Sequence, residues 1–213
     1  MALNGEGVFE HNFLGRVGRK GDLIIRLNAL HKGLNDLSQD PNDLPKELKD
    51  IAAQLVSTKM LGHSDKDVRL LSACCIVDIL RVFAPEAPFC DEEMVRVFEV
   101  IISQIRSLST YDIGSATGSK VAYILNSLST VKSCVVPVIM AQTGVQGAED
   151  LIASLFDALI TVFRKEHTAE GEQPDNCCVF DFFKSDNVPR KNVPKSKCDC
   201  LLLIFISLTS LHL

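Results

Sequence analysis

The sequence predicts an all-α fold built from stacked helical repeats. Apolar residues recur every three or four positions through most of residues 22–166, which is the spacing of an amphipathic helix. Proline, glycine and short polar stretches interrupt this spacing between the apolar segments. The composition, with 46% hydrophobic residues, only 6% aromatic ones and no tryptophan, favours a large core of aliphatic side chains.

The first two predicted helices each have one apolar face. The first begins near Asp22, and the polar turn at residues 38–43 ends it. The second is expected over residues 44–61, with Pro45 in its first turn and Gly62 as a left-handed stop. The apolar positions of these two helices are Leu23, Leu27, Leu30, Leu34, Leu37, Leu48, Ile51, Leu55 and Val56.

The stretch from Ser64 to Pro88 contains the predicted central helix. Ser64 or Asp65 can cap its first turn, because a short side-chain oxygen accepts a hydrogen bond from an orphaned backbone N–H. Pro85 ends it, since proline disfavours helical geometry in the residue before it. Its apolar residues cover two faces, so other helices must pack on both sides. They are Val68, Leu70, Leu71, Cys74, Cys75, Ile76, Val77, Ile79, Leu80 and Phe83.

Three more helices are expected beyond this one. Asp91 is the expected cap of a helix over residues 91–108, a helix over 119–136 is broken or kinked at Pro137, and a last helix covers 148–165. The chain then holds six or seven helices, at about 40 residues per pair, which matches the HEAT/armadillo class of repeats. Such pairs bury their apolar faces by stacking, which explains a central helix that is apolar on two sides.

The two ends of the chain fall outside the helical pattern. Residues 1–21 are glycine-rich and basic, but no strand precedes them and no Lys-Ser/Thr pair follows, so a flexible arm is favoured over a phosphate-binding loop. Residues 167–213 are polar and end in an apolar run, 201–213, that is shorter than the roughly 20 residues of a membrane-spanning helix. We therefore expect an N-terminal arm (1–21), HEAT-like repeats (22–166) and a poorly ordered tail (167–213).

Composition also limits the function. The net charge of −5 and the pI near 5.5 argue against a dedicated nucleic-acid binder, whose domain is usually basic. The first twenty residues lack the apolar segment of a signal peptide, which favours a reducing, intracellular compartment for the eight cysteines. The cysteines of the helices are then expected to act as small apolar residues.

No catalytic, cofactor or metal site is predicted. His63, Ser64 and Asp65 have the residue types of a catalytic triad, but consecutive residues cannot converge as a triad requires, so they are interpreted as capping residues. The tail cysteines are adjacent or one residue apart, which fits zinc ligands poorly, and its basic residues are expected to belong to a solvated linker. These tail residues are Cys177, Cys178, Cys198, Cys200, Lys184, Arg190, Lys191, Lys195 and Lys197.

Some of the charged residues on the central helix are candidates for chemistry. Asp67, Asp78, Arg69 and Arg81 could be considered as acid/base groups of an enzyme. In a stacked repeat, such residues more often pair with groups on neighbouring helices and hold one repeat to the next. We expect the structural role for all four.

Part of the sequence resembles a known family. Asp67, Val68 and Arg69, followed by Ala73, look like the second helix of a HEAT repeat. More specifically, SDKDVRLLSACCIVDILRVFAPEAPF resembles the cohesin-associated sister-chromatid cohesion factor, the "precocious dissociation of sisters" family. DEEMVRVFEVIISQI, YILNSLSTVKS and LFDALITVF continue the resemblance, which covers roughly residues 22–164.

The resemblance implies a non-enzymatic nuclear scaffold that binds the cohesin ring on chromatin. It implies contact with the kleisin subunit and with the release and acetylation factors, and contact with DNA only through partners. No membrane role is expected. The alternatives are a generic HEAT-repeat adaptor of an unrelated pathway, or a non-functional truncated fragment.

Overall fold

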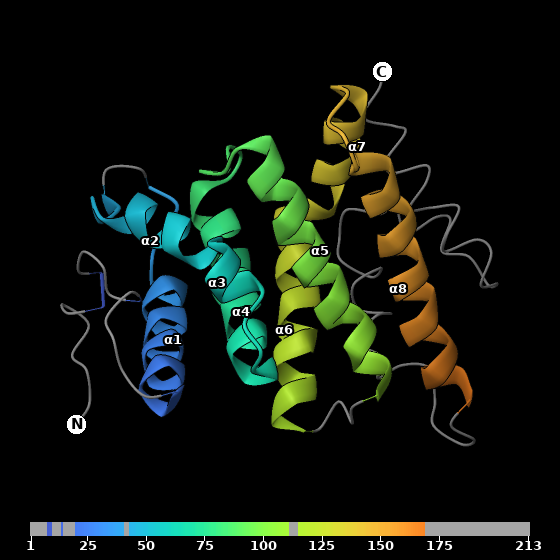
Figure 1. Cartoon of the computed structure of the whole chain (residues 1–213), viewed down its shortest axis with the longest axis horizontal. Coiled ribbons are helices and arrows are strands. Elements are labelled where there is room, and N and C mark those ends of the chain that lie inside the picture. Colours follow the sequence, from blue (N-terminus) through green and yellow to red (C-terminus); the bar gives the residue numbers. More distant parts are fainter. Residues whose placement is uncertain (1–7, 10–13, 15–19, 41–42, 111–114, 169–213) are drawn as a thin grey trace.

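Figure 1 shows the chain, a computed structural model, as helices packed in two layers. The described residues form eight α-helices and two short 3-10 helices, and contain no strand. The all-α prediction is confirmed for this part of the chain. The structure describes residues 8, 9, 14, 20–40, 43–110 and 115–168.

The layers follow from which helices contact one another. In the first layer α1 (Lys20–Asn35), α4 (Lys66–Phe83) and α6 (Ala116–Val131) lie side by side, with α4 in the middle. In the second layer α5 (Asp91–Ser107) packs along α8 (Ala148–Thr168). Contacts of α5 with α4 and α6 join the layers. This is the stacking that the repeat length predicted.

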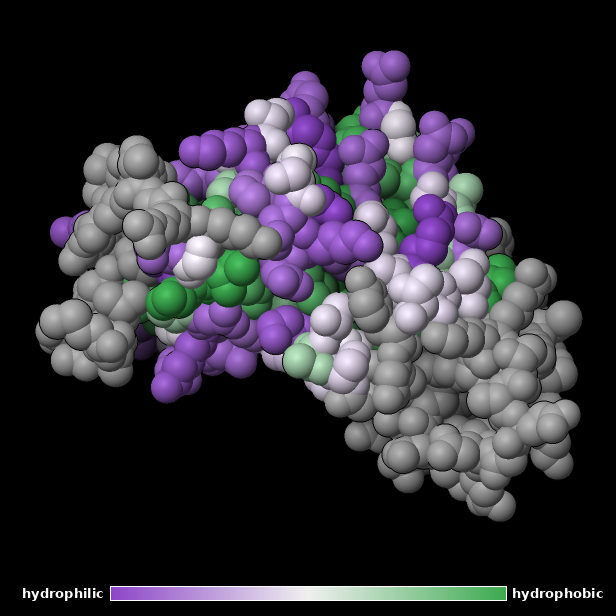
Figure 2. Space-filling view, turned by 60° about the horizontal axis from the view of Figure 1, so that its bottom comes forward, coloured by the Kyte–Doolittle hydropathy of each residue, from purple (hydrophilic) through white to green (hydrophobic). Residues whose placement is uncertain are grey.

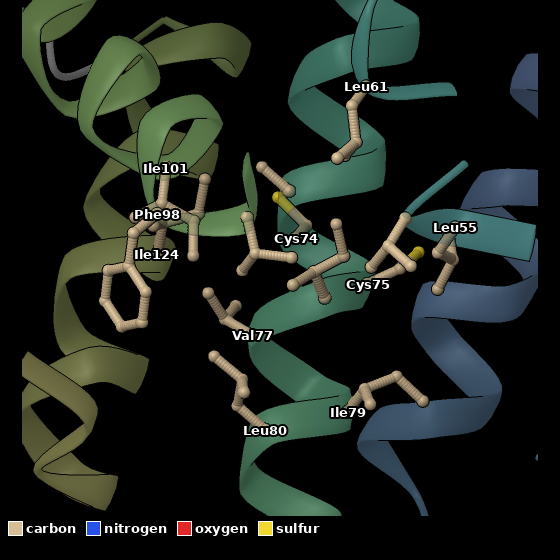
Figure 3. Packing of buried hydrophobic residues seen from close by; sticks show 14 of the residues in the cluster. Leu55, Leu61, Cys74, Cys75, Val77, Ile79, Leu80, Phe98, Ile101 and Ile124 are labelled. Atoms are coloured by element: carbon tan, nitrogen blue, oxygen red, sulfur yellow. The ribbon is translucent and has the colours of Figure 1, made fainter. Parts of the chain in front are cut away.

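Helix α4 is buried on almost every side, as the two apolar faces predicted. Figure 3 shows Cys74 and Cys75 pointing to opposite sides of α4. Cys75 lies toward Leu55 of the second predicted helix, whereas Cys74 lies toward Phe98 and Ile124 on α5 and α6. The buried residues of α4 are Val68, Leu70, Leu71, Ser72, Ala73, Cys74, Cys75, Ile76, Val77, Asp78, Ile79, Leu80 and Val82.

The prediction of a single helix over residues 44–61 is wrong, because two helices form there. They are α2 (Leu48–Leu55) and α3 (Thr58–Leu61), and Pro45 precedes both. Ser57 separates them in an extended conformation (φ −59°, ψ 146°), and its hydroxyl donates to the Gln54 carbonyl at 2.7 Å. A serine that bonds the local backbone in this way competes with helix continuation.

Gly62 is not the left-handed stop that was expected. Its φ is −90°, which any residue can adopt. The glycine is required for space instead, since a Cβ there would lie 2.8 Å from the Thr58 carbonyl oxygen. The last turn of α3 therefore closes against Gly62 through its backbone N–H, which donates to that carbonyl at 2.9 Å.

The starts of α4 and α5 show one correct prediction and one error. Asp65 caps α4, and α4 ends at Phe83, before Pro85, as expected. For α5 the cap position belongs to Cys90, and Asp91 is the first helical residue. The Cys90 backbone N–H donates to the Glu93 carboxylate at 3.0 Å, so the side chain three residues on closes this helix start.

The break expected at Pro137 occurs five residues earlier, at Lys132. Lys132 takes a left-handed conformation (φ 58°, ψ 24°) that ends α6. The segment 133–142 then runs at 82° to α6 and holds η4 (Ser133–Val135) and α7 (Val136–Gln142). Pro137 lies in the first turn of α7, where the missing N–H costs nothing.

Three residues of the predicted N-terminal arm pack against the stack. Val8 and Leu14 are buried, and Phe9 is partly buried against the core. A Cβ at Gly33 of α1 would lie 3.3 Å from Phe9 and 3.4 Å from Val8, so a glycine allows this close approach. The Leu14 N–H donates to Gln54 of α2 at 3.2 Å. These contacts cover part of the α1 edge of the stack.

Candidate functional site

A buried polar cluster joins the three helices of the first layer. We call His31 of α1, Asp78 of α4 and Tyr123 of α6 the three-helix cluster. Asp78 is fully buried, and both of its oxygens are used: Oδ2 lies 2.6 Å from His31 Nδ1, and Oδ1 accepts from the Tyr123 hydroxyl. The His31 and Tyr123 rings meet edge to face with centroids 4.9 Å apart. Helices α1 and α6 thus meet over Asp78 and cover it, and Asp78 is the charged residue of α4 that is buried.

Asn35 of α1 extends the cluster toward solvent. Its side-chain amide lies 3.1 Å from the Tyr123 hydroxyl oxygen. A tyrosine hydroxyl has one proton, which Asp78 already receives, so the consistent assignment turns the Asn35 NH2 toward Tyr123 as a donor. Both oxygens of Asp78 and the hydroxyl of Tyr123 then have partners, as buried polar groups require.

The surroundings keep Tyr123 in its donor form. Burial, followed by the hydrogen bond to the Asp78 carboxylate, raises the pKa of Tyr123 above its usual range. A phenolate here would face the Asp78 charge with little water to screen it. Tyr123 therefore stays protonated and continues to donate to Asp78 at neutral pH.

Arg81 makes a second link from α4 to α1. Its guanidinium donates to the Leu34 carbonyl at 2.7 Å and to the Leu37 carbonyl at 3.1 Å. A cation at these last carbonyls of α1 also complements the negative end of the helix dipole. Gln39, after α1, donates back to the Arg81 carbonyl at 2.7 Å. The prediction that Asp78 and Arg81 hold neighbouring helices together is confirmed.

Arg69 and Asp67 do not link helices in this way. The Arg69 guanidinium donates to the His63 carbonyl, only six positions earlier in the chain. Asp67 is exposed in the first turn of α4, where its charge suits the helix dipole. For this pair the expected inter-repeat role is wrong, because both residues lie near the start of α4, where Arg69 bonds to the local His63 carbonyl and Asp67 is exposed.

Residues 63–65 form the cap of α4. Asp65 accepts hydrogen bonds from the backbone N–H groups of Asp67 (3.0 Å) and Val68 (3.2 Å). His63 Nδ1 accepts from the Asp65 backbone N–H at 3.1 Å. These bonds satisfy backbone donors at a helix start, as the capping interpretation predicted.

The two cysteines of α4 face different helices. Cys74 Sγ lies 3.9 Å from the Lys120 carbonyl of α6, and Cys75 Sγ lies 3.5 Å from the Leu27 carbonyl of α1. Burial raises the pKa of Cys74 to about 12 and that of Cys75 well above its usual value. Thiols that stay protonated are poor nucleophiles and poor metal ligands, so both act as small apolar residues, as expected.

The described part of the chain holds no group of three or more His, Cys, Asp or Glu residues placed to bind a metal ion. The tail residues considered above lie outside the described residues. Among the described residues, no single helix is long and apolar enough to cross a bilayer. The bent pair of α6 with residues 133–142 passes that test by length and composition.

The face shown in Figure 2 has many hydrophilic residues, and hydrophobic residues are visible near the α1 end and between hydrophilic residues elsewhere. The large apolar side chains that are most exposed are Ile25 on α1 and Ile139 on α7. In the second layer Arg106 of α5 pairs with Asp157 of α8 at 2.9 Å, on the outside of the stack. The described surface thus offers helix faces for contact with other molecules.

His31, Asn35 and Tyr123 were not among the candidate residues that the sequence pattern indicated. The available signal was Asp78, a carboxylate within an otherwise apolar helix, which must find donors if it is buried. His31 and Tyr123 are 47 and 45 positions away from it along the chain. Periodicity within one helix carries no information about such partners.

The fold and the cluster define a helical-repeat solenoid protein. Its layers are stacked helices, and α1, α4 and α6 run in the same direction, since Leu27 and Leu34 of α1 meet Cys75 and Arg81 of α4 in the same order along the chain. The polar atoms of the cluster join these helices to one another. The family described as "Sister chromatid cohesion protein PDS5 protein" matches residues 21–185. The chain belongs to this family. The match extends beyond the range of residues 22–164 over which the resemblance was expected, into the segment predicted to be a tail.

Individual relatives give the same result. The chain is 34% identical to the Schizosaccharomyces pombe sister chromatid cohesion protein pds5 over 71% of its length, which is 12% of that protein. It is 31% identical to human PDS5 homolog A over 68% of its length, 10% of that protein. A chain of the solved Pds5–Scc1 complex matches 91% of this chain with a TM-score of 0.60 and 26% identity, over 26% of its own length.

These matches establish the HEAT-type solenoid fold. The chain spans between 7% and 13% of the length of the curated relatives that it matches. It therefore corresponds to a small number of the helical repeats of those proteins.

Proposed function

We propose that this chain is part of a non-enzymatic scaffold that associates with the cohesin ring on chromatin and regulates sister-chromatid cohesion. The observation that carries the proposal is the similarity of 91% of the chain to a chain of the Pds5–Scc1 complex. The three-helix cluster supports a scaffold rather than an enzyme, since its donors and acceptors are used to join helices. Burial likewise keeps the thiols of α4 protonated.

The proposed partner is the kleisin subunit of cohesin. Cohesin release and acetylation factors are proposed as further partners, and DNA is reached through these proteins. The net charge of −5 supports an indirect contact with DNA, since a direct phosphate contact favours a basic surface. The proposed location is the nucleus, on chromatin.

Binding of the purified 213-residue chain to purified kleisin tests the proposal. We expect saturable binding by calorimetry, with a helical circular dichroism spectrum that shows the chain to be folded under the same conditions. If a folded chain does not bind kleisin at concentrations where a full-length relative does, the proposed partner is wrong. A generic HEAT adaptor then becomes the better hypothesis.

A matched pair of variants assigns the binding face. Asn126 on α6 and Ser103 on α5 are exposed polar residues on the first and second layers. Asn126→Arg and Ser103→Arg place the same bulky charge on each layer without touching the core. Weaker kleisin binding by only one variant would identify the layer that contacts kleisin. Equal binding by both variants and the parent chain would exclude the surroundings of both residues.

A further inference from the structure

Helix α1 differs from the other two helices of the first layer in how many helices it packs against. Among the described helices, its one extensive interface is with α4. Val8 and Phe9 also pack beside Gly33 of α1. Helix α6, by contrast, packs against α4 and α5 and continues into η4. An edge helix with one principal neighbour has fewer contacts to break when it leaves, so it belongs to the least stable part of the stack.

The contact between α1 and the stack has an apolar part and a polar part. The apolar part includes Leu27, Leu30 and Leu34, which are fully buried. The polar part has two components. One is the three-helix cluster with Asn35, in which His31 and Asn35 of α1 reach Asp78 of α4 and Tyr123 of α6. The other is the Arg81 guanidinium of α4, which donates to the Leu34 and Leu37 carbonyls. Of these two polar components, the cluster is the one that connects α1 to two helices at once.

We propose that the three-helix cluster is a latch: while it is closed α1 stays docked on α4, and when it opens α1 leaves as a unit while α4, α5 and α6 remain packed. This is a conformational device of the fold itself and does not depend on the proposed function. Release uncovers the side of α4 that carries Cys75, an apolar strip that is buried in the closed state.

The buried carboxylate makes the latch a two-state element. In the closed state both Asp78 oxygens have donors, and in the open state water can reach them. A partly open state removes one donor while Asp78 is still buried, and an unpaired buried charge is strongly unfavourable. The intermediate is therefore avoided, and α1 is either docked or released. His31 is partly exposed and Asn35 is exposed, so water lies next to the cluster from the start.

The reactivities of the two adjacent cysteines of α4 can show which neighbouring helix, α1 or α6, has left α4. Cys75 faces α1 and Cys74 faces α6, on opposite sides of α4 in Figure 3. Release of α1 removes the cover that α1 gives to Cys75, next to Leu55 of α2, while α6 still covers Cys74. Global unfolding exposes both thiols together. The exposed Cys90 is an internal reference for the reactivity of an accessible thiol in the same chain.

The test is site-resolved alkylation of the full chain by iodoacetamide, read by mass spectrometry. His31→Phe keeps a ring beside Tyr123 but removes the donor to Asp78. We expect the alkylation rate of Cys75, relative to Cys90, to rise about 10-fold or more, as for loss of a hydrogen bond to a charged group. The ratio of the Cys75 rate to the Cys74 rate should rise by about the same factor, because only α1 is released. Arg106→Gln, which removes the interhelix ion pair of the second layer, is the control and should change neither rate.

Tyr123→Phe is the second variant, and it removes the hydroxyl while it keeps the ring. It should also raise the Cys75 rate above the Cys74 rate, and it keeps the test valid if His31→Phe does not fold. Equal acceleration of both cysteines in the folded variants would show global loosening and overturn the latch. Rates indistinguishable from those of Arg106→Gln would overturn it as well.

Discussion

Two polar links between helices in this molecule use similar chemistry in different surroundings. In the first layer His31 and Asp78 lie 2.6 Å apart, with side-chain exposures of 21% and 0%. In the second layer Arg106 and Asp157 lie 2.9 Å apart, with exposures of 48% and 67%. The distances suggest equal strength, but both partners of the second pair are exposed to water, whereas Asp78 in the first pair has no exposed surface. Burial rather than distance decides what each link contributes.

The consequence is that breaking a buried pair and breaking an exposed pair cost different amounts of stability. Solvated partners of a surface pair lose little when they separate, so such a pair contributes about 0–1 kcal/mol. A buried carboxylate that loses its donors keeps its desolvation cost and has nothing to offset it. The two layers are therefore expected to respond differently to the same kind of substitution.

The largest effect is expected when both donors to Asp78 are removed. The double variant His31→Phe, Tyr123→Phe should lower the free energy of unfolding by about 3–5 kcal/mol, since it leaves a buried charge unpaired. Urea unfolding followed by circular dichroism measures this. Adding Asp78→Leu to the double variant should recover most of the loss, because the charge is then gone. No recovery would show that packing, and not the Asp78 charge, causes the loss.

Tyr123→Phe alone should have an intermediate effect. It removes one hydrogen bond to the carboxylate and the contact with Asn35, so we expect a loss of about 1.5–3 kcal/mol. The same urea titration measures it, with Thr130→Val on the exposed side of α6 as the control. A loss no greater than that of the control would mean that His31 alone satisfies Asp78.

Arg81→Met should cost somewhat less than the change at Tyr123. It removes the hydrogen bonds to the carbonyls of Leu34, in the last turn of α1, and of Leu37, just beyond it, but keeps the aliphatic stem, so we expect about 1–2 kcal/mol. Amide hydrogen exchange locates the effect. Faster exchange in the last turn of α1, with α8 unchanged, is the expected pattern, and uniform acceleration across the chain would contradict it.

The smallest effect is expected in the second layer. Asp157→Asn should change the stability by no more than about 0.5 kcal/mol, because the Arg106–Asp157 pair is solvated on both sides. The difference from the parent chain should disappear in about 1 M salt, which screens exposed charges beyond about 3 Å. A loss comparable to that of Tyr123→Phe would show that the two links are energetically alike and would remove the contrast between the layers.

The local signals of the sequence were sufficient where the chain itself supplies the partner. Asp65 and Pro85 set the two ends of α4, since a cap and a helix breaker act within a few residues. The two apolar faces of α4 correctly predicted neighbours on both sides. Ser57 and Lys132 were missed as break points, because serine and lysine are compatible with a helix and their conformations depend on how the following helices pack.

By itself the sequence determined most of the helices, their repeat and the family to which the chain belongs, because periodicity, caps and motifs are local properties of the chain. The break at Ser57 and the end of α6 at Lys132 were not among the features it determined. It also indicated that Asp78 needed partners. Only the tertiary structure decided that those partners are His31 and Tyr123, and that α1 and α6 meet over α4. The physical reason is that a buried charge requires donors but does not specify where in the chain they come from. Packing of the three helices makes that selection.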